Sequence, residues 1–280
     1  MNFKKIIVFI YRFISSIYIF IFGRKSMQSI NNVILSLSLN AKGYKNYGNF
    51  GKTGEKNFIK KIRDELSLSL DIGANVGKYT QLLLSETNTK IISFEPLNHA
   101  YLDLKKIEKK NLDRLKVFNI AIGEKDEILD LNFSGDKSEK ASFSKDLDKL
   151  SFYEFSKNKK IKTRIFKLDT FFEENKNIIA SEKIDLIKID TEGHELEVIK
   201  GAQNIIKNNP PKYIQFEFNW HQLFKNHTMI SFLYYLQEYD LFQLLPYGDN
   251  LIKVDPNRPE TNIFHLSNFV YIRKDISEKY

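Results

Sequence analysis

A short glycine-containing loop follows an apolar run and has the residues of a ligand-binding turn. The run ends at Asp71, and the loop at residues 73–77, GANVG, precedes a helical pattern that starts near Lys78. In open α/β sheets ligands bind beyond the carboxyl ends of the strands, and Gly73 and Gly77 would supply a positive φ or the clearance that a Cβ obstructs. The residues that we expect to bind a cofactor here are Asp71, Gly73, Ala74, Asn75 and Gly77.

An acidic residue ends the next apolar run, IISFE. This residue is Glu95, and Pro96 follows it and breaks the strand. A carboxylate at this place can accept two hydrogen bonds from the 2′- and 3′-hydroxyls of a ribose. NAD enzymes use the same arrangement, so Glu95 alone does not identify the nucleotide. The loop is more informative, because Asn75 stands where the dinucleotide fingerprint GxGxxG has its second glycine, and a pyrophosphate needs a bare backbone there.

A second group of polar residues follows the apolar run DLIKI. Asp190 ends this run, Glu192 lies in the loop after it, and His194 opens an amphipathic pattern. Two carboxylates and an imidazole at one rim could position and deprotonate an alcohol, so we expect these three residues to be catalytic. The alternative is that Glu192 supports the helix N-terminus electrostatically and that His194 is merely exposed. Glu217 and His221, near the end of the run YIQF, could line the same pocket or be purely structural.

These residues need a scaffold that brings several strand ends to one edge. From about residue 50 the chain alternates short apolar runs with helical patterns. This alternation predicts right-handed βαβ units and a mostly parallel sheet with helices on both faces. The expected strands are 66–71, 90–95, 116–121, 185–190 and 213–218, and the expected helices are 79–85, 99–110 and 195–207.

Two parts of the chain depart from this alternation. Between residues 123 and 160 the pattern is polar and strand-like, which predicts an inserted hairpin or loop over one sheet edge. After residue 239 no long helix is expected, and the chain should end in an antiparallel pair of strands joined by a turn-rich stretch. The strands expected in these parts are 128–133, 141–143, 241–246 and 268–273.

With these motifs in place, the chain resembles the FkbM family of methyltransferases. The resemblance rests on DIGANVG, FEP, NIAIG, LDTF, IKIDTEGHE and the pair Gly201-Ala202, in this order over roughly residues 65–220. It implies a class I methyltransferase fold, Rossmann-like and seven-stranded, with S-adenosylmethionine as donor. It usually implies O-methylation of a hydroxyl on a sugar or related metabolite. By the same resemblance Ala121 would lie near the adenine, and Ser142 would bind the acceptor.

Two other functions remain open from the sequence. An NAD-dependent oxidoreductase of the Rossmann type is disfavoured by the missing GxGxxG. Tyr101 and Lys105 have the Tyr-x-x-x-Lys spacing of some such enzymes, but their helix is expected to be remote from the site. A non-catalytic, membrane-tethered binding module would keep the fold without turnover. A metal ion is not expected, because the carboxylates are scattered along the chain.

Composition limits the class of protein and its partners. The chain has 280 residues, of which 42% are hydrophobic and 28% charged, which is typical of a globular protein with one domain and an appendage. It has no cysteine, which excludes disulfides, thiolate zinc sites and a cysteine nucleophile, and fits a reducing compartment. The net charge of +8 comes mostly from lysines spread evenly along the chain, so nucleic acid is not expected as a partner.

The N-terminal segment is expected to be a separate hydrophobic element. Residues 6–22, IIVFIYRFISSIYIFIF, are nearly all apolar, and basic residues flank them on both sides. Their length is at the lower limit for spanning a bilayer, and Arg12 costs about 3 kcal/mol against roughly −5 kcal/mol from the apolar residues. The helix could span the membrane, lie in its plane, or pack on the catalytic domain.

These patterns predict two parts of the chain. Residues 1–45 would be the hydrophobic helix and a linker, with the helix as a possible membrane anchor, and residues 46–280 the methyltransferase domain. The domain is expected on the cytoplasmic side of a membrane or free in the cytoplasm. Its acceptor would be a small molecule or a glycan, with a cell-surface glycan or its lipid-linked precursor as the favoured class.

Overall fold

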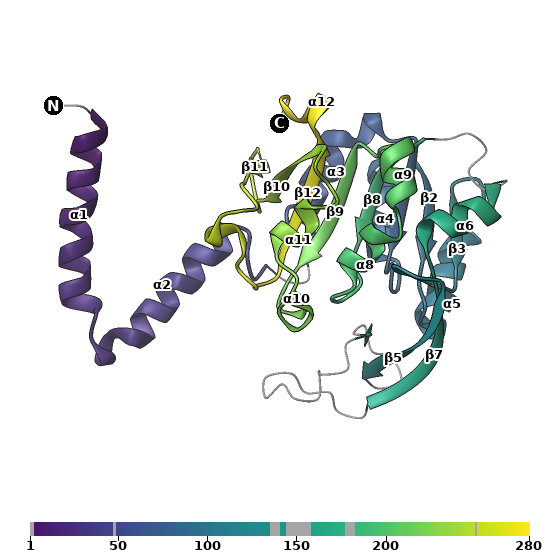
Figure 1. Ribbon diagram of the computed structural model, residues 1–280, viewed down its shortest axis with the longest axis horizontal. Helices are drawn as coiled ribbons and strands as arrows, with labels where there is room; N and C mark the ends of the chain where they lie inside the picture. The colour runs from purple at the N-terminus through teal and green to yellow at the C-terminus, as the bar shows by residue number, and fades with distance from the viewer. Residues whose placement is uncertain (1–2, 47–48, 135–140, 144–157, 177–182, 250) are drawn as a thin grey trace.

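The apolar runs of the sequence form the parallel centre of a large sheet (Figure 1). The structure is a computed structural model, and it describes residues 3–46, 49–134, 141–143, 158–176, 183–249 and 251–280. The sheet has eight strands in the order β11-β10-β12-β9-β8-β1-β2-β3. The strands from β3 to β9 in this order pair in parallel, and β12, β10 and β11 continue the sheet antiparallel. Their bounds are β1 Leu68–Ile72, β2 Lys90–Phe94, β3 Leu115–Phe118, β8 Ile184–Ile189, β9 Tyr213–Phe218, β10 Tyr239–Leu244, β11 Leu251–Lys253 and β12 Ser267–Arg273.

The expected class I methyltransferase architecture is confirmed, with one strand more than predicted. Seven strands match the predicted layout, including the final antiparallel pair β10 and β12, and β11 adds an eighth strand at the edge. The apolar run at residues 116–121 does not form one strand. It divides into β3 and a short strand β4 (Ala121–Ile122), which belongs to a second sheet.

Helices cover both faces of the large sheet. Side chains of α3, α4 and α5 pack in one apolar cluster, and those of α6, α8, α9 and α11 pack in another, as the inward-facing stripes of amphipathic helices require. The bounds are α3 Glu55–Ile62, α4 Lys78–Glu86, α5 Asn98–Glu108, α6 Leu168–Glu174, α8 Glu195–Lys200, α9 Gln203–Asn208, α10 His221–Lys225, α11 Met229–Leu233 and α12 Lys274–Ser277. The short 3-10 turns are η1 Lys25–Met27, η2 Arg63–Glu65 and η4 Pro259–Thr261.

The predicted helix at residues 195–207 is two helices. α8 ends at Lys200 and α9 begins at Gln203, with Gly201 between them. A Cβ on Gly201 would lie 1.9 Å from the carbonyl oxygen of Gly123. The chain therefore breaks the helix at the place where two backbones touch, and only glycine permits that approach.

The polar region after residue 123 joins β4 in a second, four-stranded sheet, with the order β4-β7-β5-β6. β5 (Glu127–Ser134) and β6 (Ala141–Ser142) pair antiparallel, as predicted for the hairpin. β7 (Asn158–Phe166) was not predicted, because its alternation of lysine with isoleucine and threonine has few apolar residues. Residues 158–165 of β7 pair with β5, and β7 lies below the large sheet in Figure 1. The rest of the insertion, residues 135–140 and 144–157, lies outside the described residues.

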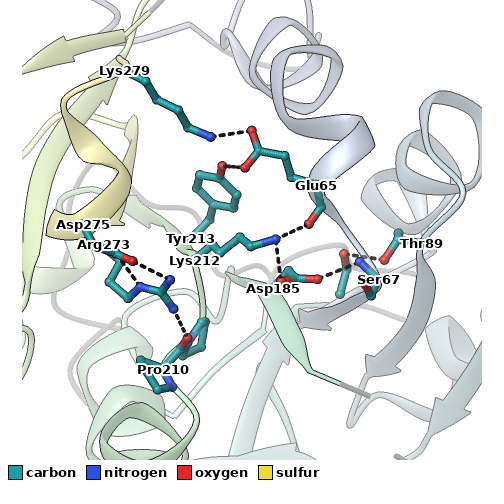
Figure 2. Close-up of polar contacts among 12 residues, drawn as sticks. Glu65, Ser67, Thr89, Asp185, Pro210, Lys212, Tyr213, Arg273, Asp275 and Lys279 are labelled. Carbon is teal, nitrogen blue, oxygen red and sulfur yellow. Dashed lines mark hydrogen bonds and ion pairs between the residues drawn. The ribbon is translucent and has the colours of Figure 1, made fainter. Parts of the chain in front are cut away.

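Ion pairs close the edge of the sheet where the parallel strands begin. Figure 2 shows Lys279 and the hydroxyl of Tyr213 both contacting the carboxylate of Glu65, at 2.6 and 2.7 Å. Lys212 pairs with Asp185 at 3.0 Å. The contact of Lys279 fastens the C-terminal segment to this edge, and the parallel strands end at the opposite edge.

The N-terminal helices project from the domain (Figure 1). The first, α1 (Phe3–Phe22), contains one segment, Lys5–Phe22, that is long and apolar enough to cross a membrane by length and composition, with a mean hydropathy of 1.9. None of that segment is buried, so the alternative that it packs on the catalytic domain is wrong. The second helix, α2 (Gln28–Ala41), leads from α1 to the domain.

The end of the expected linker belongs to the core of the domain. Leu39 and Tyr44 are buried in the same apolar cluster as the sheet, at 6% and 1% exposure. The ring of Tyr44 packs edge-on against Phe269, and the amide of Lys45 donates to the carbonyl of Leu266 at 2.8 Å. The structural domain therefore starts before residue 46.

Removing residues 1–45 is expected to destabilise the domain, whereas removing residues 1–27 is not. A chain that starts at Asn46 loses the burial of Leu39 and Tyr44, and deletions of large buried side chains cost about 3 kcal/mol or more. A chain that starts at Gln28 keeps both residues. Urea unfolding of the two chains measures the difference in free energy, and equal stability would show that these contacts contribute nothing.

Candidate functional site

Alternation along the strands places a row of polar side chains on one face of the sheet. Asp71 on β1 is paired with Lys188 on β8, which in turn is paired with Gln215 on β9. Since successive side chains of a strand point to opposite faces, these three point together toward α3 and α4. The next row, two residues further along, contains Glu217 beside Asn268 of β12.

Four carboxylates surround the buried ammonium of Lys188. Its Nζ lies 3.3 Å from Asp190 and 3.6 Å from Glu55, and its side chain is 2% exposed. Burial alone would lower the pKa of Lys188, but Asp190, Glu55, Glu217 and Asp71 raise it above the ordinary value. The lysine is therefore a cation, and the carboxylates outnumber it.

These groups line a cavity of about 230 Å³, here called the acidic cavity. Glu55 is fixed at its wall by the hydroxyl of Thr53 at 2.6 Å and the amide of Gln215 at 3.0 Å. With four carboxyl groups around one lysine, the cavity favours a positively charged ligand group over a negatively charged one. Its lining residues are Asn46, Asn49, Phe50, Thr53, Glu55, Asp71, Gly73, Ala74, Asn75, Val76, Lys78, Tyr79, Lys188, Asp190, Glu217, Leu266 and Asn268.

A second cavity, of about 130 Å³, adjoins the acidic cavity and is here called the Glu95 cavity. The two share Gly73, Asn75 and Asp190 as lining residues, so a ligand can extend from one into the other across the loop. Apart from its acidic residues the Glu95 cavity is largely apolar, which suits a flat aromatic ring. Its lining residues are Ile72, Gly73, Asn75, Phe94, Glu95, Pro96, Leu97, Ile120, Ala121, Ile122, Leu131, Phe143, Asp190, Thr191 and Glu192.

The glycine loop is held close to both neighbouring strands. Gly73 has a φ of +82°, and a Cβ there would lie 1.9 Å from the carbonyl oxygen of Asp190. The amides of Gly73 and Ala74 both donate to the carbonyl of Phe94 at 3.0 Å. The loop thus lies directly over the ends of β1, β2 and β8. The other glycine, Gly77, also has a positive φ and opens α4.

The carboxylate of Glu95 lies at the centre of the Glu95 cavity wall. Its Oε2 accepts from the amide of Asn75 at 2.8 Å, and its Oε1 accepts from the amide of Leu97 at 2.7 Å. Burial raises the pKa of Glu95 to about 7, although the two amides act to lower it. Each oxygen keeps a lone pair for a ligand hydroxyl, so the residue can accept from a vicinal diol.

Asp71 precedes the loop and is hydrogen-bonded to the helix that follows it. It is 1% exposed and accepts a 2.6 Å hydrogen bond from the hydroxyl of Thr80. Burial raises the pKa of Asp71 to about 6, and the bond from Thr80 opposes this rise. The residue therefore ties the end of β1 to α4, and its charge contributes to the acidic cavity.

The loop after β8 presents Glu192 to the Glu95 cavity. Glu192 has a φ of +51°, a strained conformation for a residue with a side chain. Its Oε2 lies 3.1 Å from Nε2 of His221, and its carbonyl oxygen accepts from the hydroxyl of Ser142 at 2.8 Å. The side chain is 29% exposed while that of His221 is 2% exposed, so the carboxylate is the accessible member of the pair and the imidazole lies behind it.

Glu195 holds this loop in place, a role that the sequence did not reveal. Its buried carboxylate accepts from the amides of Thr191, at 2.9 Å, and Gly193, at 3.1 Å. The amide of Gln222 on α10 donates to the same carboxylate. Since these bonds fix the backbone on both sides of Glu192, Glu195 acts as a positioning residue.

His194 does not lie where a catalytic residue is expected. Its ring is buried against Phe143, at 5.0 Å between centroids, and its Nδ1 lies 3.8 Å from Glu197. Burial lowers the pKa of His194 to about 4. It lines neither cavity, because the turn into α8 directs it toward Gly123 instead. The structure therefore does not bring His194 to either cavity, and the histidine that contacts Glu192 is His221.

The other predicted residues lie at the two cavities or support them. Ala121 lines the Glu95 cavity, and Glu217 lines the acidic cavity. Burial, with Asp190 and Glu192 nearby, raises the pKa of Glu217 well above its ordinary value. Ser142 is buried and contacts the loop backbone rather than a cavity.

Within the described ranges no group of three or more His, Cys, Asp or Glu is placed to hold a metal ion.

Sequence reasoning missed several residues of the acidic cavity, among them Glu55, Lys188 and Asn268. Glu55 and Asn268 come from segments that precede and follow the predicted family core, and Lys188 lies inside an apolar run. The side-chain oxygen of Asn268 is buried without a hydrogen-bond partner among the described residues. Such an atom, at the wall of a cavity, is suited to accept a hydrogen bond from a ligand.

Comparison with known proteins points to one family. The model of the methyltransferase FkbM domain matches residues 71–241. No curated protein matches the chain.

Several solved structures are similar to the chain. An rRNA methylase from Streptococcus thermophilus has 11% identity and a TM-score of 0.40, with 78% of this chain and 93% of that chain covered. A precorrin-6y C5,15-methyltransferase from Geobacter metallireducens GS-15 has 9% identity and a TM-score of 0.38, with 79% and 88% covered. The human methyltransferase 10 domain containing protein has 10% identity and a TM-score of 0.39, with 88% and 96% covered.

Proposed function

Since this chain belongs to the FkbM methyltransferase family, we propose that it transfers a methyl group from S-adenosylmethionine to a hydroxyl of a sugar or related metabolite. The observation that carries the proposal is the pair of cavities that meet at Gly73, Asn75 and Asp190. The Glu95 cavity offers a buried carboxylate with free lone pairs, and the acidic cavity offers an excess of carboxyl groups over its one lysine. A nucleoside with a cationic tail needs both.

The residues present fit this cofactor. Glu95 would accept from the ribose hydroxyls, and Ala121 and Leu97 would contact the adenine in the apolar part of the Glu95 cavity. The ammonium and sulfonium groups are cations, which the carboxylates of the acidic cavity favour. Lys78, at the start of α4 and on the cavity wall, suits the methionine carboxylate, since a helix N-terminus also favours an anion.

The proposed reaction requires the protein to align the acceptor with the methyl group and to remove one proton from the acceptor hydroxyl. When bound, S-adenosylmethionine supplies an electrophilic methyl group on a positively charged sulfur. The protein must orient the acceptor oxygen in line with that methyl group and exclude water. Glu192 is placed to accept the hydroxyl proton, His221 orients its carboxylate, and Ser142 holds its backbone. Asp190, at the junction of the two cavities, would orient the acceptor.

Two experiments test the cofactor and the reaction in turn. Calorimetric titration with S-adenosylhomocysteine and with NADH should show binding of the first alone. Incubation with a methyl-labelled donor and isolated cell-surface glycans, or their lipid-linked precursors, should then transfer label, which mass spectrometry locates as one added methylene. Binding of NADH instead would favour an oxidoreductase, and cofactor binding without labelling of any glycan fraction would favour a non-catalytic module.

The exposed apolar helix supports attachment of the enzyme to a membrane. The segment Lys5–Phe22 has no contact with the domain that would bury it, and basic residues flank it at Lys5, Arg24 and Lys25. A chain without cysteine suits the reducing cytoplasmic side. Flotation of the full-length protein with lipid vesicles tests the attachment, and protein that stays at the bottom of the gradient would contradict it.

A further inference from the structure

The second helix, α2, carries an apolar stripe that no part of the protein covers among the described residues. Ile30, Val33, Ile34 and Leu37 are 46%, 59%, 43% and 64% exposed. Their spacing of three, four and seven residues puts them on one side of the helix, and one further exposed leucine, Leu35 at 57%, lies outside this stripe. Only Leu39 of this helix is buried, where α2 reaches the domain. Four large apolar side chains in a row on an exposed helix need a partner.

The contacts of α2 show how the stripe is oriented relative to α1. The side chain of Asn31 accepts from the hydroxyl of Tyr18 at 2.7 Å and donates to the carbonyl of Phe22 at 2.9 Å. Asn31 therefore joins the two helices on a face of α2 other than the stripe. Figure 1 shows α2 extending between α1 and the domain, in contact with the domain only at its end.

Charge and continuity identify the partner as a lipid bilayer. No charged residue lies between Gln28 and Ala41, whereas basic residues stand on both sides of α2, at Arg24 and Lys25 before it and at Lys42 and Lys45 after it. Apolar side chains between basic ends match a surface of acyl chains beneath anionic headgroups, where each basic residue contributes about 1 kcal/mol. The stripe also follows α1 in the chain, and the apolar segment of α1 is unburied.

We propose that α2 docks on the surface of the bilayer through Ile30, Val33, Ile34 and Leu37. The proposal rests on the membrane attachment of α1 but assigns a separate contact to α2. It brings the active site close to the lipids, since Asn46 lines the acidic cavity and lies five residues after Ala41, at most about 18 Å of extended chain. The acceptor class that suits this placement is a hydroxyl compound carried on a lipid, presented just above the headgroups.

The absence of cysteine from the chain allows a direct test in the full-length protein. Val33→Cys and Leu37→Cys place a fluorescent label on the stripe. Asn32→Cys, on the opposite side of the same helix, is the matched control, and Lys110→Cys labels the exposed surface of the domain. Each labelled protein is mixed with vesicles of phosphatidylcholine and phosphatidylglycerol, with and without lipids that carry a quencher in the acyl chain.

The two stripe labels are expected to be quenched at least about twofold more than the labels at Asn32 and Lys110, because only the apolar side enters the acyl region. Flotation of the same samples separates the two proposals. Protein that fails to float contradicts the membrane attachment itself. Protein that floats with equal quenching at positions 32, 33 and 37 contradicts the docking of α2 alone. A blue shift of the stripe labels without quenching would assign the stripe to a second copy of the chain.

Discussion

Replacing Glu192 by glutamine is expected to lower turnover by about 10²-fold or more, the usual effect of losing a general base, while the affinity for S-adenosylhomocysteine stays within about threefold. The substitution keeps the shape of the side chain and removes its basicity. Glu192 and Glu95 both line the Glu95 cavity, but they come from the ends of different strands, β8 and β2, and the ribose contacts are expected from Glu95. Turnover on the identified acceptor and calorimetry with the cofactor product measure the two quantities.

Two further variants show whether the loss of turnover comes from the missing base or from a general effect of the substitution. Glu173→Gln changes an exposed carboxylate on α6 and should leave both quantities unchanged. His221→Asn removes the imidazole that contacts Glu192 at 3.1 Å, and it should lower kcat more than it raises KM if the imidazole orients the base. Near-normal turnover of Glu192→Gln would remove Glu192 from the mechanism and direct the same test to Asp190→Asn.

The central strands and the cofactor loop could be predicted because their signals are local. A buried strand appears as a continuous apolar run, and a polar residue at its end stands out, as Asp71, Glu95 and Asp190 do. The parallel topology follows from the helices between the runs. These two facts suffice to bring the three carboxylates to one edge.

The acidic cavity could not be predicted, because strand register and two distant segments build it. Asp71, Lys188 and Gln215 stand side by side only through the pairing of β1 with β8 and of β8 with β9. A signal was present, since Lys188 and Gln215 are polar residues inside buried runs. Glu55 and Asn268 gave no such signal, because their segments meet the strand ends only in the folded chain.

A sequence pattern also does not predict which way a side chain points at the start of a helix. His194 and Glu192 are separated by a single glycine, yet one faces Gly123 and Phe143 while the other faces a cavity. The positive φ of Glu192 and Gly193 turns the chain between them. The spacing of residues places the loop at the rim but does not say which of its members faces the substrate.

Replacing Glu95 by alanine is expected to weaken binding of S-adenosylhomocysteine by about 1.5–3 kcal/mol, roughly 10- to 150-fold, the range for a hydrogen bond to a charged group. The fold should persist, since the carboxylate follows the end of β2 and adds little apolar burial. Calorimetry gives the affinity, and circular dichroism confirms the fold. Asp103→Ala, an exposed acidic residue on α5, is the control. Unchanged affinity in a folded Glu95→Ala protein would exclude the ribose contact.

The pH dependence of this affinity separates the ribose contact from a general loss of structure. Burial raises the pKa of Glu95 from 4.5 to about 7, and the ribose hydroxyls donate best to the ionised form, so affinity should rise as pH increases from 6 to 8, by up to about tenfold. Glu95→Gln should remove this rise, although Asp71, with a pKa of about 6, still titrates.

The stability of the folded protein depends on the ionisation of Glu95 with the opposite sign. Because the folded pKa of Glu95 is raised, its contribution to stability is fully present below pH 4.5 and is lost as pH rises through about 7. Affinity that rises with pH while stability falls is therefore the signature of a buried carboxylate that binds the ribose, and a rise of equal size in Glu95→Gln would assign the titration to another group.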